Sequence, residues 1–141
     1  MSVYEIILLM NGSVIIIDDD EDILELLTEY LSLEDFDVVG QGIDGLQAVN
    51  LYAEHKPDFV ILDIAMPNYD GIYGLENIKK INPNAIVIIL TGNSDKSLAE
   101  KIIQLNATII LEKPYPVEKL VSIMKSIQNY TLHPNVMNVS S

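Results

Sequence analysis

The sequence predicts an α/β fold in which one parallel sheet of five strands carries helices on both faces. Five short apolar runs alternate along the chain with segments whose apolar residues recur at helical spacing. The runs are rich in Ile and Val and show little polar alternation, as in strands that are buried on both faces. Only a few residues connect each strand to the next helix, and right-handed crossovers place such helices on both sides of the sheet. We therefore expect one doubly wound domain.

Composition and charge narrow the classes of function. The chain has 141 residues, of which 49% are hydrophobic and 21% charged, as in a soluble globular domain. It has no cysteine, which excludes disulfides, thiolate zinc sites and cysteine nucleophiles. A formal net charge of -13 opposes binding to nucleic acid and to anionic membranes. No basic signal region precedes the N-terminal apolar stretch, and no apolar run reaches about 18 residues, so we expect a cytoplasmic protein.

The first residues allow more than one interpretation. Val3 to Met10 and Ser13 to Ile17 are two β-favouring runs joined by Asn11-Gly12, and that pair favours a type I′ hairpin. The second run, however, has the composition of an interior parallel strand, whose two edges are normally both occupied. The first twelve residues are then left to cover an edge, to exchange with a neighbouring molecule or to remain without fixed structure.

Five consecutive acidic residues, 18–22, follow this first core strand. We interpret the last three as a helix start, because Asp caps helices well and acids in the first turn interact favourably with the helix dipole. Asp18 and Asp19 stand at the end of the strand itself. In the helix that follows, Leu24 is expected to face outward, and the core-facing stripe consists of Ile23, Leu26, Leu27, Tyr30 and Leu31.

The middle of the chain contains two further strands. Asp37 to Gly40 is a short strand, and Asp44 then caps a helix that stops near Pro57 and carries Leu46, Val49, Leu51 and Tyr52. Phe59 to Asp63 is the third strand, with four apolar residues before its final carboxylate. A loop leads from it into a helix over residues 72–81.

Two more strand and helix pairs complete the pattern. Ala85 to Leu90 forms a strand that finishes at Thr91, and Ser94 is expected to cap a helix with Leu98, Ile102 and Leu105. Thr108 to Leu111 forms the fifth strand. Pro116 suits the first turn of a last helix bearing Val117, Leu120, Val121 and Met124. The helical spacing of apolar residues ends at Gln128. The predicted organisation is therefore an N-terminal extension (1–12), one domain (13–128) and a disordered polar tail (129–141).

Four of the five strands end in groups suited to phosphate or metal, namely Asp18-Asp19, Asp63, Thr91 and Lys113. A parallel sheet brings all carboxyl ends to one edge, where ligands of open α/β sheets bind. This set suits transfer of a phosphoryl group to Asp63 as the nucleophile. Mg²⁺ held by Asp19 and Asp63, with Asp18 acting directly or through water, would neutralise the carboxylates. Lys113 and the Thr91 hydroxyl would stabilise the remaining phosphoryl oxygens.

The sequence resembles the receiver domains of two-component response regulators, and of stand-alone, chemotaxis-type regulators in particular. The resemblance spans about Val14 to Gln128 and rests on four motifs: Val-Ile-Ile-Ile-Asp-Asp-Asp (14–20), Leu-Asp-Ile-Ala-Met-Pro-Asn-Tyr-Asp-Gly (62–71), Thr-Gly (91–92) and Lys-Pro-Tyr (113–115). It implies a flavodoxin-like strand order of 2-1-3-4-5. It also implies metal ligation by Asp19, Asp63 and the backbone carbonyl of Ala65, and often a cis bond before Pro114.

The same resemblance implies a phosphoprotein in a phosphorelay, with Asp63 phosphorylated by the phosphohistidine of a sensor histidine kinase or phosphotransfer protein. Such a protein is not a dedicated enzyme, although it catalyses its own phosphorylation and its slow dephosphorylation. Two positions depart from the family pattern. Ile110 stands where many members have Tyr or Phe, so an aromatic switch is not expected. Ala65 stands where many members have a polar residue, and it has no group to orient an attacking water, so we expect slow hydrolysis.

No pattern for a DNA-binding or enzymatic output domain follows residue 128, so we expect output by phosphorylation-dependent binding to a downstream protein. The family's output face, formed by the fourth and fifth domain helices and the fifth strand, offers Ile103, Ile110 and Ile123 as outward apolar residues. These three are also consistent with packing inside the domain. A homodimer is a further alternative.

Two other functions use the same residues. A haloacid-dehalogenase-like phosphatase would make Asp18 the nucleophile, but it needs a late acidic pair, and the only acid after Lys113 is Glu118. A receiver-like interaction module would dock to partners without ever being phosphorylated. The complete acidic pocket argues against this second alternative.

Overall fold

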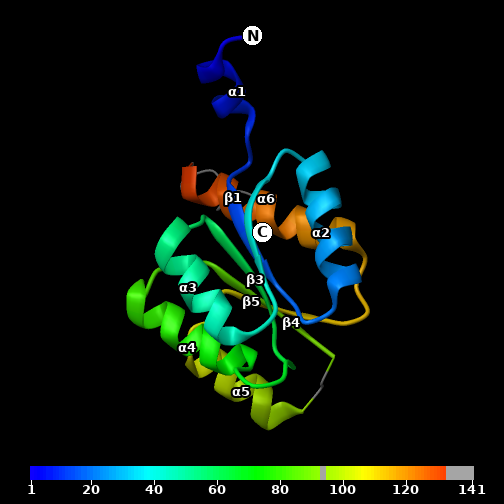
Figure 1. Ribbon diagram of the computed structural model, residues 1–141, viewed down its shortest axis with the longest axis vertical. Coiled ribbons are helices and arrows are strands. Elements are labelled where there is room, and N and C mark those ends of the chain that lie inside the picture. Colours follow the sequence, from blue (N-terminus) through cyan, green and yellow to red (C-terminus); the bar gives the residue numbers. More distant parts are fainter. Residues whose placement is uncertain (93–94, 133–141) are drawn as a thin grey trace.

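All five predicted strands pair in one parallel sheet, in the order β2-β1-β3-β4-β5 (Figure 1). The computed structural model describes residues 1–92 and 95–132. The strands are β1 (Ser13–Ile17), β2 (Asp37–Gly42), β3 (Phe59–Asp63), β4 (Val87–Thr91) and β5 (Ile109–Glu112). Both the fold class and the strand order are therefore as predicted.

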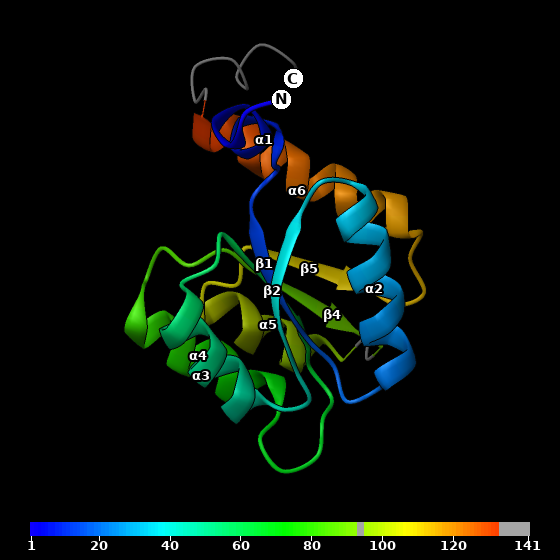
Figure 2. The same ribbon diagram turned by 45° about the horizontal axis from the view of Figure 1, so that its top comes forward.

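Helices cover both faces of this sheet (Figure 2). One face packs against α2 (Glu21–Leu33) and α6 (Val117–Leu132). The other packs against α3 (Gly45–His55), α4 (Gly71–Ile81) and α5 (Lys96–Gln104). Within the described ranges, no helix combines the length and apolar character that crossing a bilayer requires.

Alternation of side chains along β1 divides the core into two layers. Val14 and Ile16 of β1 pack in the cluster beneath α2 and α6, whereas Ile15 and Ile17 pack in the cluster beneath α3, α4 and α5. All four side chains are fully buried. Four consecutive apolar residues of β1 thus stabilise both layers, which explains the unbroken apolar run in the sequence.

The side of α2 that faces the core differs from the predicted side by about one residue position. Leu24, which we expected to face outward, is buried, and Leu26, which we expected in the core, is 56% exposed. The buried stripe is instead Leu24, Leu27 and Leu31. Apolar residues cover more than half of the circumference of this helix, so helical periodicity alone does not determine which side faces the sheet.

The hairpin interpretation of the N-terminus is wrong, because Val3–Leu9 forms a helix, α1. β1 already has β2 on one side and β3 on the other, so no edge is free for a further strand. Asn11 does not form a hairpin turn. Its backbone N–H donates to the carbonyl of Asp35 at 2.8 Å, and its side-chain amide donates to the carbonyl of Glu34 at 2.8 Å.

The helix ends agree with the sequence in part. Asp44 caps α3, as predicted, and its side chain accepts a hydrogen bond from the N–H of Gln47. Ser94, the predicted cap of α5, lies outside the described residues, and Asp95 occupies the N-cap position. Helix α6 begins directly after Pro116 and continues to Leu132, so residues 129–132 of the predicted tail are helical. The rest of that tail, 133–141, lies outside the described residues.

Candidate functional site

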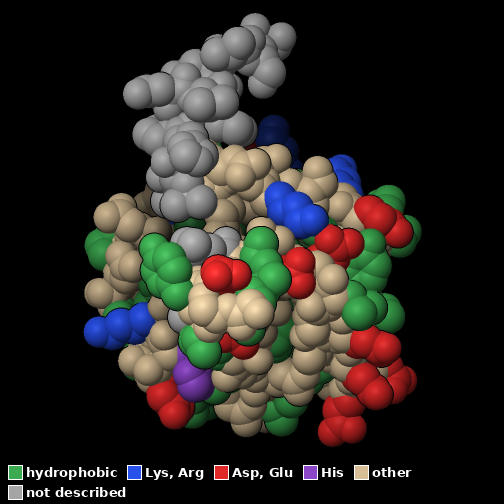
Figure 3. All heavy atoms as spheres, turned by 90° about the horizontal axis from the view of Figure 1, so that it is seen from above, with side chains coloured by type: hydrophobic (Ala, Val, Ile, Leu, Met, Phe, Trp, Pro, Cys, Tyr) green, Lys and Arg blue, Asp and Glu red, His purple; other side chains and the backbone are tan. Residues whose placement is uncertain are grey.

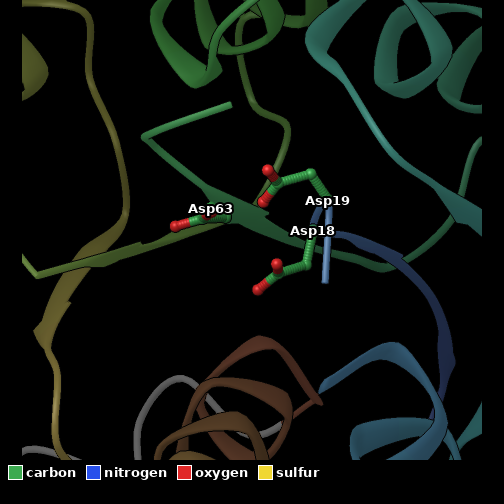
Figure 4. Close-up of side chains that lie close together, drawn as sticks. All are labelled: Asp18, Asp19 and Asp63. Carbon is green, nitrogen blue, oxygen red and sulfur yellow. The ribbon is translucent and has the colours of Figure 1, made fainter. Parts of the chain in front are cut away.

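The three predicted metal-binding carboxylates meet at the carboxyl edge of the sheet. Asp18 and Asp19 directly follow β1, and Asp63 is the last residue of β3. These strands are neighbours, with Ile17 paired to Leu62, so the register itself brings the acids together. One carboxylate oxygen from each of the three lies within 4.8 Å of the other two (Figure 4).

Two of these carboxylates are buried and one is exposed. Asp18 is 2% exposed and Asp63 is 5% exposed, whereas Asp19 lies at the surface. Oδ1 of Asp18 accepts a hydrogen bond from the N–H of Asp20 at 2.9 Å. Its other oxygen, Oδ2, is buried and has no hydrogen-bond partner among the described residues. A buried carboxylate oxygen that accepts no hydrogen bond is costly unless a cation lies close to it.

Burial raises the pKa of the Asp18 carboxyl above its usual range. Among the smaller influences, the hydrogen bond from Asp20 and the ammonium of Lys113 lower this pKa, whereas the charges of Asp63 and Asp19 raise it. Together these interactions make the ionised form of the Asp18 carboxyl less favourable than it is in water. Hard oxygen ligands with excess negative charge and an open surface position suit Mg²⁺, so the residues present fit the predicted ion.

Lys113 supplies the positive charge of the site. It follows β5, and its Nζ lies 3.1 Å from Oδ1 of Asp63 and 3.7 Å from Oδ2 of Asp18. The first distance is a charge-assisted hydrogen bond. Three ionised carboxylates and one ammonium would leave two negative charges, so Lys113 does not neutralise the cluster by itself.

Thr91 and Ala65 lie on neighbouring parts of the same edge. Thr91 is the last residue of β4 and is buried, one position beyond Leu90, which pairs with Asp63. Ala65 is exposed in the loop that follows β3. The roles of the Thr91 hydroxyl and of the Ala65 carbonyl remain predictions.

Backbone contacts fix the loop between β3 and α4. The N–H of Gly71 donates to the carbonyl of Ile64 at 3.1 Å, and Asp70 caps α4 by accepting a hydrogen bond from Tyr73 at 3.0 Å. The N–H of Gly45, at the start of α3, donates to the carbonyl of Tyr69 at 2.6 Å. This loop is therefore held from both ends, which positions Ala65 relative to Asp63.

Sequence reasoning missed the place of Tyr115 beside the site. Burial raises the pKa of its phenol to about 12, with further contributions from the charges of Asp18 and Asp63. The peptide bond between Lys113 and Pro114 is cis, as the resemblance implied. Tyr115 follows that proline directly, so the Lys-Pro-Tyr motif was the available signal that the tyrosine belongs to the site.

Comparison with known proteins agrees with this geometry. Residues 14–125 match the family described as the response regulator receiver domain. The chain is 32% identical over 120 residues to the chemotaxis protein CheY of Bacillus subtilis, an alignment that covers 85% of this chain and 100% of that protein. It is also 32% identical over 117 residues to sporulation initiation phosphotransferase F of the same organism, covering 83% and 94% of the two chains.

A solved structure supports the same assignment. A chain in the crystal structure of the CheX-CheY-BeF3-Mg complex from Borrelia burgdorferi superimposes with a TM-score of 0.76 and 32% identity, covering 82% of this chain and 87% of that one. Fold, sequence motifs and convergent acidic residues thus agree along nearly the whole domain. The chain belongs to the receiver domain family of two-component response regulators.

Proposed function

We propose that this protein is a response regulator of the cytoplasm whose receiver domain accepts a phosphoryl group on Asp63. The observation that carries the proposal is the position of Asp63. Its carboxylate ends a buried strand within 4.8 Å of two other acids, and one of its oxygens lies 3.1 Å from the ammonium of Lys113. A nucleophile, a candidate cation site and a fixed positive charge converge there.

The proposed donor is the phosphohistidine of a sensor histidine kinase or phosphotransfer protein. A carboxylate oxygen of Asp63 attacks the phosphorus, so an O–P bond forms while the N–P bond of the donor breaks. The electron pair of that bond stays on the imidazole nitrogen, which takes up a proton. The product is a mixed anhydride on Asp63. Little covalent chemistry is left for the protein, so positioning and charge stabilisation are the main contributions.

Asp18, Asp19 and Asp63, with the backbone carbonyl of Ala65, would hold Mg²⁺. The bound ion would offset the excess negative charge and stabilise a phosphoryl oxygen. The buried Oδ2 of Asp18, which accepts no hydrogen bond from the described residues and lies 3.7 Å from the ammonium of Lys113, supports this assignment. Lys113, already beside Asp63, would hold a second phosphoryl oxygen by its ammonium. The hydroxyl of Thr91, at the end of the adjacent strand β4, would contact a third.

Output would come from binding to a downstream protein once Asp63 is phosphorylated. Of the three apolar residues that we expected to face outward, Ile103 on α5 is 63% exposed. Ile110 on β5 and Ile123 on α6 are half-buried and pack against the two core clusters. Ile103 is therefore the strongest of the three candidates for contact with a partner, and Ile110 is placed to respond to movement within the core.

Phosphotransfer tests this proposal. We expect the wild-type chain to take up a radiolabelled phosphoryl group from an autophosphorylated histidine kinase or from acetyl phosphate, and only when Mg²⁺ is present. Asp63→Asn should abolish uptake, whereas Asp37→Asn, which removes an exposed acid at the opposite edge of the sheet, should leave it unchanged. Lack of uptake by the wild-type chain from either donor would support the unphosphorylated docking module instead.

The phosphatase alternative predicts a different result. The family assignment already argues against a haloacid-dehalogenase-like enzyme. In that mechanism Asp18 would carry the phosphoryl group, so Asp63→Asn would retain labelling and Asp18→Asn would lose it. The two variants together therefore separate the mechanisms.

A further inference from the structure

Helix α1 lies outside the part of the chain that matches the receiver family. It spans Val3–Leu9 and precedes residue 14, where the family match begins. Figure 1 shows it projecting beyond the edge of the sheet at which β1 begins, opposite to the carboxyl edge. Helices shorter than about 12–15 residues are marginal in water without tertiary packing, and α1 has only 7 residues. The apolar side chains of Val3, Tyr4, Ile6 and Leu9 therefore require a cover.

The described part of the chain does not provide that cover. Val3 is 73% exposed, Tyr4 71%, Ile6 48% and Leu9 59%. Figure 3, which views the molecule from the α1 end, shows hydrophobic side chains at this surface. The base of the segment, in contrast, is fixed, because Asn11 bonds to the carbonyls of Glu34 and Asp35, and the N–H of Asp37 donates to the carbonyl of Gly12 at 2.9 Å.

A cavity of about 480 Å³ opens on the same amino edge of the sheet. It lies where α3 and α4 end and where β3 and β4 begin, and its lining includes Tyr52, Lys56, Pro57, Ile81 and Ile86. Ile81 is 44% exposed, so an apolar surface is available there. The cavity adjoins the base of the α1 segment, since Asp58, also in its lining, accepts a hydrogen bond from the N–H of Ser13 at 2.8 Å.

Charge favours a second copy of this chain over a membrane as the cover. Glu5 is the only charged side chain among the first twelve residues, and the chain has no Lys or Arg before Lys56. Interfacial helices that bind anionic membranes instead carry Lys and Arg on their polar face. Lys56 is exposed and forms no ion pair with any residue in the described ranges. It therefore offers Glu5 of another copy a complementary charge at the rim of the cavity.

We propose that α1 of one molecule packs over this cavity of a second molecule, and that the second molecule's α1 packs reciprocally. The result is a two-fold symmetric dimer in which Ile6 and Leu9 cover Ile81 and Ile86, and Glu5 pairs with Lys56. If only the two α1 helices touched each other, the buried area would be smaller than the roughly 1,000 Å² that a stable interface needs. The reciprocal arrangement also buries the surfaces of both cavities. It leaves the two acidic sites at opposite ends, far apart and open.

Complementation between two variants tests this arrangement. The full chain should sediment as a dimer at micromolar concentrations. Ile6→Asp and Ile81→Asp should each weaken dimerisation by about tenfold or more, because each breaks both apolar contacts of a homodimer. A mixture of the two variants should dimerise more tightly than either alone, because the helix of the Ile81→Asp chain meets an intact cavity on the Ile6→Asp chain. Equal weakness in the mixture would overturn the proposal.

Charge exchange provides an independent measurement. Glu5→Lys and Lys56→Glu should each weaken the dimer, and the double variant E5K/K56E should restore it. Ile43→Asp, an equally exposed apolar position at the carboxyl edge, should have no effect. A wild-type chain that is monomeric at all concentrations, or a dimer that is indifferent to Ile81→Asp, contradicts the proposal. Uptake of phosphoryl groups from acetyl phosphate should be unchanged in the Ile6→Asp variant, so this test is separate from that of the proposed function.

Discussion

At the scale of single residues, the site is dominated by uncompensated negative charge. Asp18 is almost fully buried, and its Oδ2 has no hydrogen-bond partner in the described part of the chain. Its pKa is raised by burial and by neighbouring acids, so the ionised form is less favourable in the folded chain than in the unfolded one. The resulting loss of stability is present at neutral pH and disappears as pH falls below the ordinary pKa of the group.

Asp18→Asn should therefore stabilise the metal-free protein at neutral pH, by roughly 2–5 °C in melting temperature. The same change should remove the stabilisation by Mg²⁺ that the wild-type chain gains through binding to the folded state. Thermal unfolding followed by circular dichroism, with and without Mg²⁺, measures both effects. Asp37→Asn removes one exposed acid elsewhere and should leave the Mg²⁺ effect intact. A destabilised, Mg²⁺-responsive Asp18→Asn variant would contradict this view of the site.

Ala65 should determine how long the phosphoryl group remains. Its methyl group has no means of orienting an attacking water, so we expect the isolated phosphoprotein to lose its phosphate slowly. Ala65→Asn adds a hydrogen-bonding group without altering the backbone carbonyl and should shorten the lifetime by about tenfold, the equivalent of one hydrogen bond. Ala65→Val adds bulk alone and should not accelerate the loss. Hydrolysis of the wild-type phosphoprotein within seconds would disprove the expectation.

At the scale of elements, the sequence was informative about strands and less so about the orientation of helices. The limits of β3 were predictable, because it is a short apolar run that ends in a carboxylate, whereas β4, expected over residues 85–90, spans Val87–Thr91. The parallel arrangement of the strands made the convergence of the acids at Asp63 predictable. Leu24 and Leu26 were exchanged, because α2 carries apolar residues around most of its surface. Helix α1 was missed because Asn11-Gly12 is a strong hairpin pattern, and only the pairing of β1 on both sides excludes a hairpin.

Close packing between elements explains why small residues stand near the site. A Cβ atom at Gly45 would overlap the carbonyl oxygen of Asp70 and lie 3.0 Å from the backbone nitrogen of Gly74, so α3 approaches α4 and its preceding loop at backbone distance. Gly45→Ala should cost about 2 kcal/mol or more of unfolding free energy, because neither backbone is free to move aside. Urea unfolding measures this loss.

Gly92→Ala is the matched control for that substitution. A Cβ atom there would meet nothing within 4 Å, so the change should alter the unfolding free energy by no more than about 0.5 kcal/mol. Equal stability of the Gly45→Ala and Gly92→Ala variants would show that the approach of α3 to the loop is looser than the structure indicates.

At the scale of the whole molecule, the dominant property is the net charge of -13. Self-repulsion of this size destabilises a compact state, and salt screens it over distances of about 10 Å at 0.1 M. Sodium chloride should therefore raise the melting temperature of the full chain by a few degrees between low and physiological ionic strength, without Mg²⁺ present. A melting temperature that is independent of salt, or that falls, would show that the charges are already balanced within the fold.

Location of the phosphoryl group tests the central claim most directly. The wild-type chain, phosphorylated with acetyl phosphate and Mg²⁺, can be treated with borohydride, which converts an aspartyl phosphate to homoserine and marks its position for peptide mass spectrometry. We predict the mark at Asp63 and its absence in the Asp63→Asn variant. A mark at Asp18, or no mark at either residue, would contradict the account.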